Sequence, residues 1–179
     1  MANALIAAIY ACDWVQTLAR LATHPAEAAL AGHLGMLPLY WACICQAPLA
    51  VVQALLHAHP AAASTPTKYG ELPLHCAAYY QAPIDVFKLL LHAYPEAAYK
   101  ADNYDWLPLH YATRSPTPAS VGVVAALLAA HPEAALKHDN NGDLPNLAQY
   151  PAAAITAALR AQAAARRRPA MLAWVAARM

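Results

Sequence analysis

The apolar positions of the chain recur with a period of 35 residues. Leu-Pro-Leu-His stands at residues 72–75 and again at 107–110, and Leu-Pro-Leu-Tyr stands at 37–40. A fixed period of this length predicts one supersecondary unit copied along the chain, in which each copy buries its apolar face against its neighbours. Leucines at one offset are expected to fill this shared core, and alanines at another are expected to let the helices approach closely. The leucines are Leu39, Leu74 and Leu109, and the alanines are Ala42, Ala77 and Ala112.

The prolines follow the same period. Because proline fixes φ and lacks an N–H, it is tolerated at the first position of a helix and excluded from the interior. Each unit is therefore predicted to hold two short helices with prolines at their starts, for example at about residues 73–80 and 83–93. The next unit is two residues longer, and we place the extra residues near 120–122. Of the 15 prolines, 12 fall into three periodic classes: Pro25, Pro60, Pro95 and Pro132; Pro38, Pro73, Pro108 and Pro145; Pro48, Pro83, Pro118 and Pro151.

The connectors between units contain turn-forming residues. Asp-Asn-Tyr-Asp occupies residues 102–105, and Asp-Asn-Asn-Gly occupies residues 139–142. These residue types tolerate left-handed backbone and bond to nearby amides, so a hairpin-like turn is expected in each connector. Backbone bonding then explains the four acidic residues there better than acid–base catalysis or calcium binding does. They are Asp102, Asp105, Asp139 and Asp143.

These motifs resemble the ankyrin repeat. Leu-Pro-Leu-His-Cys-Ala-Ala at 72–78 is similar to its Thr-Pro-Leu-His-x-Ala-Ala signature, and Val-x-x-Leu-Leu at 86–90 is similar to the run that follows. The resemblance covers roughly residues 1–159 and implies a mainly α fold, an ankyrin-type helix-turn-helix repeat solenoid with short hairpin-like turns. The chain departs from the family in two ways: leucine replaces the motif threonine at Leu37, Leu72 and Leu107, and each unit is about two residues longer than the usual 33.

The resemblance also divides the chain into units. We expect an N-terminal cap at 1–34, central units at 35–69, 70–104 and 105–141, a C-terminal cap at 142–159, and a basic C-terminal helix or tail at 160–179. Residues 1–12 are apolar but lack the basic start of a secretory leader, so a capping helix is the better interpretation. No uninterrupted apolar stretch reaches the length of a membrane span, which predicts a soluble protein.

The cysteines and histidines of the chain suit packing better than chemistry. Four cysteines, of which Cys43 and Cys45 lie two apart on one short helix, do not form a disulfide framework, so a reducing compartment, cytoplasmic or nuclear, is expected. A metal site built from Cys43, Cys45 and Cys76 with His57 or His59 is the alternative, but Cys-x-Cys is not the spacing of zinc sites. His75 and His110 recur with the repeat, so we expect each to bond to backbone in its own unit.

Enzymatic motifs are missing from the sequence. The five glycines form no phosphate-binding loop, and there is no nucleophile elbow. We therefore expect a non-enzymatic protein that uses no cofactor and no metal.

The resemblance implies a binding surface made of the hairpin tips and the residues that follow Ala-Ala in each first helix. Half of the residues transferred from the two best copies are aromatic, although only 8% of the chain is. Tyr, Trp and Arg dominate binding energy at interfaces, so we expect a protein-interaction scaffold, monomeric by itself, with another protein as partner and no small-molecule substrate. The transferred residues are Lys68, Tyr69, Glu71, Tyr79, Tyr80, Asn103, Tyr104, Trp106, Arg114 and Ser115, and His33, Leu34, Met36, Ile44 and Cys45 extend the surface toward a more apolar end.

Two alternatives remain open at this point. Tyr69 and Tyr104 share one offset, so they could stack on each other and stiffen the hairpins, with Trp106 covering a leucine. The second alternative concerns charge, because 5 of the 11 basic residues lie at or after Arg160. An amphipathic segment there would favour an anionic membrane surface, or less readily nucleic acid, through Arg166, Arg167 and Arg168.

Overall fold

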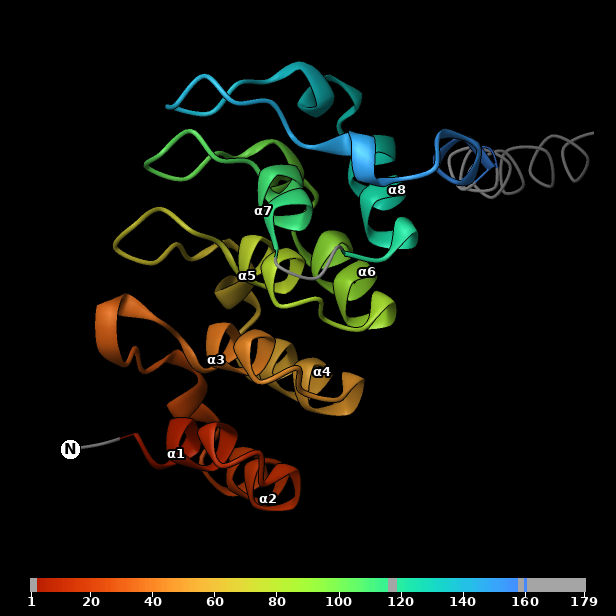
Figure 1. The fold of residues 1–179 in the computed structure, drawn as a ribbon. Coiled ribbons are helices and arrows are strands. Elements are labelled where there is room, and N and C mark those ends of the chain that lie inside the picture. Colours follow the sequence, from red (N-terminus) through yellow and green to blue (C-terminus); the bar gives the residue numbers. More distant parts are fainter. Residues whose placement is uncertain (1–2, 116–118, 158–159, 161–179) are drawn as a thin grey trace, which may run out of the picture.

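The computed structural model describes residues 3–115, 119–157 and 160. Its helices form helix–turn–helix pairs that stack side by side, and the loops between pairs project to one side (Figure 1). No residue of these ranges is in a β-strand. The predicted mainly α repeat solenoid is confirmed. The pairs are α1 (Ala4–Tyr10) with α2 (Trp14–Thr23), α3 (Pro38–Ile44) with α4 (Leu49–Ala58), α5 (Pro73–Tyr79) with α6 (Ile84–Ala93), and α7 (Pro108–Arg114) with α8 (Val121–Ala130).

Proline marks the helix starts, but in two different ways. Pro38, Pro73 and Pro108 occupy the first helical position of α3, α5 and α7, where the missing N–H costs nothing. Pro48 and Pro83 instead stand just before α4 and α6, as cap residues. The predicted helices at about 73–80 and 83–93 therefore lie within one residue of α5 and α6.

The remaining periodic prolines, Pro25, Pro60, Pro95 and Pro132, each begin a further short helix that we did not predict from the sequence. Each is a 3-10 helix of five residues that starts at the proline and buries alanine. The first three of these helices contact both helices of the next pair, so they fill the space between stacked units. These helices are η1 (Pro25–Ala29), η3 (Pro60–Ser64), η4 (Pro95–Tyr99) and η5 (Pro132–Leu136); two others are η2 (His33–Gly35) and η6 (Leu147–Gln149).

The two extra residues of the longest unit do not lie where the sequence placed them. Helix α8 begins at Val121, and the Ser120 hydroxyl caps it by accepting a hydrogen bond from the Val123 amide at 3.3 Å. Ser120 thus takes the place that Pro83 holds before α6. The extra residues must precede Ser120, and the prediction of 120–122 is wrong because a serine cap replaces proline at the helix start.

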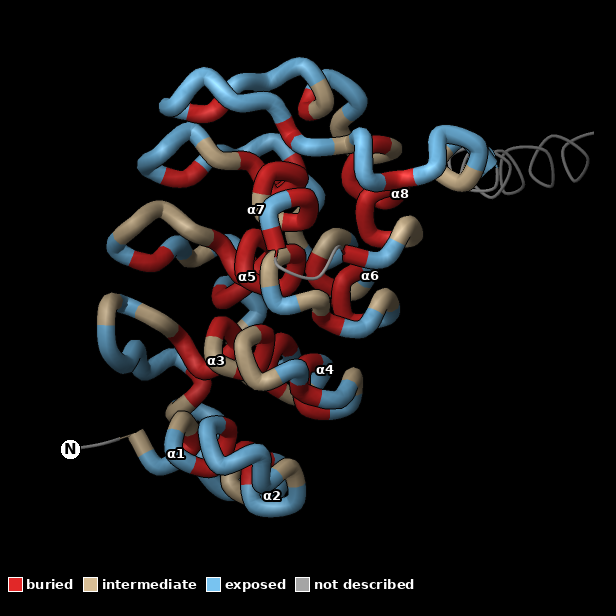
Figure 2. The backbone as a smooth tube through the Cα atoms, viewed as in Figure 1, coloured by how far each residue is buried: buried red, intermediate tan, exposed pale blue. Residues whose placement is uncertain are grey.

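The core runs through all the stacked units. Leu39, Leu74 and Leu109 are at most 1% exposed and belong to one continuous apolar cluster. The alanines at the neighbouring offset, Ala42, Ala77 and Ala112, are fully buried as well, where a small side chain lets adjacent helices approach. Figure 2 shows the buried backbone concentrated in the helix pairs, while the projecting loops are largely exposed. Each buried leucine contributes roughly 1.5 to 3 kcal/mol to folding.

The projecting loops are hairpin-like, as predicted, and they are bonded to one another. Each loop contains backbone with positive φ, at Gly35, Gly70, Asp105 and Gly142, and in the first loop at Leu34 as well. In the second, third and fourth loops, one backbone amide donates a hydrogen bond to a backbone carbonyl of the preceding loop. The pairs are Lys68 to Leu34 at 3.0 Å, Asn103 to Tyr69 at 3.0 Å, and Asn140 to Tyr104 at 3.2 Å. We call this row of bonds the tip ladder. It fixes the loops as a single surface.

Within the described residues, no helix has the length and apolar character needed to cross a membrane. Arg166, Arg167 and Arg168, which carry the alternative based on charge, lie outside these residues.

Candidate protein-binding face

The hairpin tips and the first helices of the pairs form one side of the solenoid, which we call the hairpin face. A row of aromatic rings crosses it. Trp106 meets Tyr111 edge to face at 5.3 Å between ring centroids, Tyr111 meets Tyr79 at 6.1 Å, and Tyr79 meets Tyr80 at 5.1 Å. Such edge-to-face pairs are favourable beyond the area they bury. Residues from two adjacent units are thereby joined into one continuous aromatic surface.

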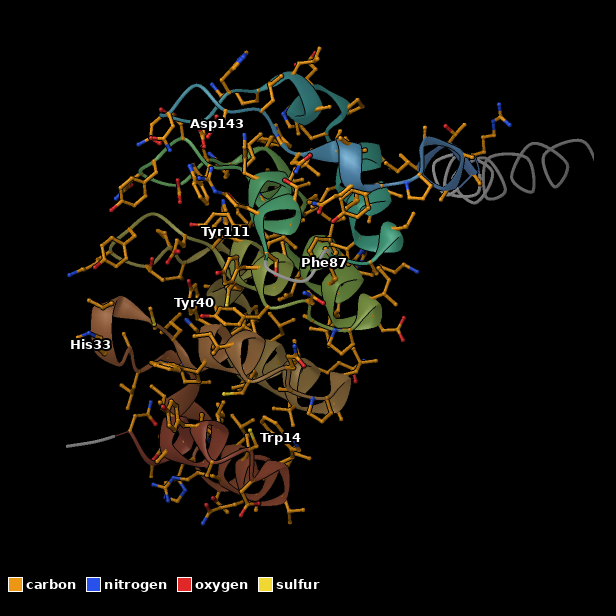
Figure 3. The ribbon with its side chains drawn as sticks, in the orientation of Figure 1. Trp14, His33, Tyr40, Phe87, Tyr111 and Asp143 are labelled. Atoms are coloured by element: carbon orange, nitrogen blue, oxygen red, sulfur yellow. The ribbon has the colours of Figure 1, made fainter. Side chains whose placement is uncertain are left out.

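The carboxylate of Glu71 joins three units by hydrogen bonds. Its Oε2 accepts from the Tyr40 hydroxyl at 2.7 Å and from Thr67 Oγ1 at 3.3 Å, while Oε1 lies 3.0 Å from the Tyr111 hydroxyl. The Tyr111 hydroxyl also lies 2.7 Å from Asp102 Oδ2. Figure 3 labels Tyr40 and Tyr111, which come from the two helices on either side of α5. Since one hydroxyl has one proton, Tyr111 serves two carboxylates with a single donor.

The two phenols of this network stay protonated. Burial raises the pKa of Tyr40, and the nearby Cys76 and the Glu71 carboxylate raise it further. Burial is also the main cause that raises the pKa of Tyr111, followed by its hydrogen bond to Asp102. Both hydroxyls therefore act as hydrogen-bond donors at any physiological pH.

Both histidines of the repeat are hydrogen-bonded through both ring nitrogens, and His75 links its unit to the next. His75 Nδ1 accepts a hydrogen bond from the Leu72 amide at 3.0 Å, so the neutral ring carries its proton on Nε2 and donates it to the Trp106 carbonyl at 3.2 Å. His110 repeats this arrangement, with the Leu107 amide at 3.0 Å and the Lys137 carbonyl at 2.9 Å. Burial lowers the pKa of both imidazoles. The predicted bond within each unit is present, and the bond of His75 to the following unit is an addition.

A cavity of about 330 Å³ opens between the first helices of three pairs. We call it the tyrosine cavity. Its size is near the lower end of the range for ligand pockets, about 300 to 1,000 Å³. It is lined by Tyr40, Tyr69, Tyr79, Tyr80 and Tyr111, together with Met36, Ile44, Glu71 and Cys76.

A second cavity, of about 460 Å³, lies beside the third and fourth tips and is lined by Tyr104, Trp106, Tyr111, Asn140 and Asn141. The indole N–H of Trp106 is buried without a hydrogen-bond partner. The Arg114 guanidinium covers the Trp106 ring at 4.7 Å from its centroid and lies 3.5 Å from Asp139 Oδ2 and 3.4 Å from Asp143 Oδ2. Arg114 is thus held by partners within the chain.

This geometry of stacked helix pairs and projecting hairpins agrees with a family comparison. The family model described as ankyrin repeats (many copies) matches residues 55–112. Over these residues the chain is similar to the ankyrin-repeat family. No curated protein matches its sequence. Ankyrin repeats are generally protein–protein interaction modules, and the family is typically non-enzymatic.

Most residues of the predicted ankyrin surface come together on the hairpin face. Tyr69, Glu71, Tyr79 and Tyr80 line the tyrosine cavity, and Tyr104 and Trp106 line the second one. Three others serve the framework. Asn103 donates from Nδ2 to the Lys68 carbonyl at 3.2 Å, Arg114 is held by its two ion pairs, and Ser115 is buried. Lys68 itself lies over the Tyr69 ring, 5.0 Å from its centroid.

The alternative in which Tyr69 stacks on Tyr104 is not found among the ring contacts of the described residues. Trp106 contacts Tyr111 and Arg114 instead. The hairpin tips are stiffened by the backbone bonds of the tip ladder, and the rings of Tyr69 and Tyr104 line cavities.

Of the apolar extension in the second unit, Met36 and Ile44 line the tyrosine cavity. His33 lines a larger cavity of about 1,110 Å³ near the N-terminal end, together with Ile6, Tyr10 and Trp41. The Leu34 carbonyl belongs to the tip ladder. Cys45 is half-buried and lines none of these three cavities.

Sequence reasoning missed Tyr40 and Tyr111, the two hydroxyls that meet at Glu71. A signal for Tyr111 was available, because it stands at a varying position inside a constant motif. The residues at this offset are Ile6, Trp41, Cys76 and Tyr111. A position that changes while its neighbours repeat is not required by the framework alone.

Two of the four cysteines, Cys43 and Cys76, are buried in the core. Burial raises the pKa of Cys43 to about 12 and raises that of Cys76 well above its ordinary value, so both remain thiols. In the part of the chain that the structure describes, no three His, Cys, Asp or Glu side chains lie close enough together to hold a metal ion.

Proposed function

We propose that this protein is a non-enzymatic scaffold that binds a protein partner through its hairpin face. The observation that carries the proposal is the aromatic row from Trp106 to Tyr80, which spans two adjacent units and stays partly open to solvent. Tyr80 is 41% exposed at the end of that row, and Tyr104 is 49% exposed on the adjacent tip. Contiguous exposed aromatic surface is uncommon on monomeric proteins unless it serves binding.

Framework packing accounts for only part of this surface. His75, Asp102 and Asn103 have every strong contact within the chain. The exposed rings of Tyr80 and Tyr104 do not, since each leaves much of its area open. The hairpin face thus contains two groups of residues: those whose contacts lie within the chain, and those whose rings remain exposed to solvent. The second group is the proposed binding surface.

The test is affinity capture with mass spectrometry, comparing the intact chain with the Tyr80→Ala/Tyr104→Ala double variant. Tyr99→Ala is the matched control, because Tyr99 is 50% exposed but lies on η4, outside the hairpin face. The proposal expects a partner that the wild type and the control retain and that the double variant loses, with similar melting temperatures for all three. Equal retention by the double variant would contradict the proposal.

A further inference from the structure

The tyrosine cavity has the chemistry of a site for a positive charge. We propose that it receives a basic side chain, lysine or arginine, from the protein partner, with the ammonium or guanidinium group beside Glu71 and against the tyrosine rings. This inference rests on the proposed function and specifies what the hairpin face recognises. It is carried by three features of the site: its ring walls, the shared hydrogen-bond donor of its carboxylate and its uncompensated charge.

The walls of the cavity are aromatic. Five tyrosine side chains from three units line it, and the Tyr79 ring meets the rings of both Tyr80 and Tyr111 edge to face. Edge-to-face contacts turn neighbouring rings so that different faces and edges are presented. The face of a tyrosine ring attracts a cation within about 6 Å of its centroid. The chain's own cations already use such faces nearby, since Lys68 lies over Tyr69 and the Arg114 guanidinium lies over Trp106.

The floor of the cavity is the carboxylate of Glu71, which shares one of its hydrogen-bond donors with Asp102, a residue outside the cavity lining. Glu71 and Asp102 both face the Tyr111 hydroxyl, at 3.0 and 2.7 Å, and only one of them can receive its proton at a time. The remaining donors to Glu71, from Tyr40 and Thr67, both reach Oε2. Oε1 is therefore left with a shared donor. An incoming N–H group would complete its hydrogen bonding.

The negative charge of this floor is uncompensated. Within the described residues, ion pairs join Arg20 to Glu27 and Arg114 to Asp139 and Asp143, and none involves Glu71 or Asp102. Hydroxyl donors stabilise a carboxylate without neutralising it. A half-buried carboxylate without a counter-ion is costly, and the cost rises when a partner covers it and displaces water.

This cost decides between possible occupants. An apolar side chain would cover Glu71 and leave its charge desolvated and unpaired, and an acidic side chain would add repulsion. A lysine or arginine side chain offsets the charge and places its aliphatic stem against Met36 and Ile44, which form the apolar part of the wall. The volume of about 330 Å³ suits one side chain of this length.

The test uses the full chain and four pentapeptides, acetyl-Gly-Ser-X-Ser-Gly-amide, in which X is lysine, arginine, glutamine or norleucine. Tyrosine ring resonances are followed by NMR during titration at low salt. The lysine and arginine peptides are expected to bind about tenfold more tightly than the glutamine and norleucine peptides, and to shift the rings of Tyr79, Tyr80 and Tyr111. Equal binding of the charged and neutral peptides, or an absence of binding by all four, would overturn the inference.

Variants of the cavity residues test whether the preference for charged peptides arises in the tyrosine cavity. Glu71→Gln is expected to reduce the preference for the charged peptides to within about twofold. Since Glu71 also holds three hydroxyls, a second variant is needed in case Glu71→Gln unfolds. Tyr80→Leu removes an exposed ring of the cavity, and it too should lower the preference. Tyr99→Leu is the control, because Tyr99 is a half-exposed tyrosine on η4 that lies outside the hairpin face and does not line the tyrosine cavity. An unchanged preference in both cavity variants would also overturn the inference.

The two proposals fail in distinguishable ways. If the captured partner requires Tyr80 and Tyr104 while the peptides show no preference for charge, the hairpin face binds protein and the cavity does not select a basic residue. If no partner depends on that face, the proposed function fails, whatever the peptides show.

Discussion

The imidazole of His75 is hydrogen-bonded on both sides, to the Leu72 amide at 3.0 Å in its own unit and to the Trp106 carbonyl at 3.2 Å in the next. A repeat protein is stable only if adjacent units hold each other. Here one buried side chain both caps the start of α5 and ties its unit to the following hairpin. The stability of both units therefore depends on the side chain of His75.

We expect His75→Ala to destabilise the protein by about 2 to 4 kcal/mol, because it leaves the buried Leu72 amide unpaired and opens a cavity. The Trp106 carbonyl is less affected, since it still accepts from the Asp102 amide at 3.0 Å. Urea unfolding measures the change. His75→Gln should recover part of the loss because a glutamine amide can accept from one group and donate to the other. Equal stability of wild type and His75→Ala would contradict the assigned role.

Acidification should destabilise the fold through His75 and His110. Burial lowers the pKa of both rings below the ordinary value of 6.5, so below pH 6.5 the unfolded chain binds protons that the folded chain does not. Folding stability is therefore fully present above that pH and is lost as pH falls, until the folded rings titrate. Protonation of Nδ1 would also remove the acceptor for the amide it caps.

The measurement is the melting temperature at pH 7 and pH 5, for wild type and the His75→Gln/His110→Gln variant. The double variant should lose less stability on acidification, whereas His138→Gln, at an exposed position, should behave like wild type. A double variant as sensitive to acid as the wild type would show that other groups dominate.

Removal of the Tyr111 hydroxyl should weaken the links among three units. Tyr111→Phe leaves Asp102 and Glu71 without their shared donor, at an expected cost of about 1 to 2 kcal/mol. Tyr104→Phe is the control, because the Tyr104 side chain is half exposed, and we expect a change within about 0.5 kcal/mol. Chemical denaturation of both variants tests the contrast, and similar losses would argue against a special role for Tyr111.

The small residue at Ala77 is required by packing. Ala77 is fully buried in the inner helix α5, so Ala77→Leu should overpack the contact between stacked units and destabilise by roughly 1 to 3 kcal/mol. Ala93→Leu adds the same side chain at an exposed position of α6 and should have little effect. Thermal melting compares the two. Unchanged melting of Ala77→Leu would count against the assigned repeat register.

Two glycines with the same backbone conformation should respond differently to substitution. Gly70 and Gly142 have φ of +81° and +83°, so alanine is strained at both by roughly 1 kcal/mol. At Gly70 an added Cβ would also lie 2.9 Å from the Asn103 amide nitrogen, whereas nothing lies within 4 Å at Gly142. Gly70→Ala should therefore be the more destabilising variant by calorimetry, and the reverse order would contradict the geometry of the tip ladder.

The repeat architecture could be predicted from the sequence because its causes are local. Pro73 at a helix start, Leu74 at a core offset and Asp102 in a turn each act within a few residues, and the period multiplies the signal. The 3-10 helix at Pro95 was missed because its support comes from burial between units rather than from its own sequence.

The candidate site was only partly predictable for a similar reason. Tyr79 and Tyr80 follow from the resemblance, since they occupy an offset that faces the hairpin side. The contact of Tyr111 with Glu71 joins residues 40 apart in sequence, and Tyr40 reaches the same carboxylate from 31 residues away. Such meetings depend on the stacking distance and helix rotation, which the pattern does not encode.

The tip ladder has a consequence for selectivity. Its backbone bonds repeat with nearly constant length from Lys68 to Asn103 to Asn140, so an elongated ligand that read only main chain could slide along the loops by one whole unit. Unlike side chains at matching offsets remove that degeneracy: Tyr79 corresponds to Arg114, and Glu71 corresponds to Trp106. The backbone of the tip ladder is the same in successive units, so the side chains that differ between units define the one position at which such a ligand binds.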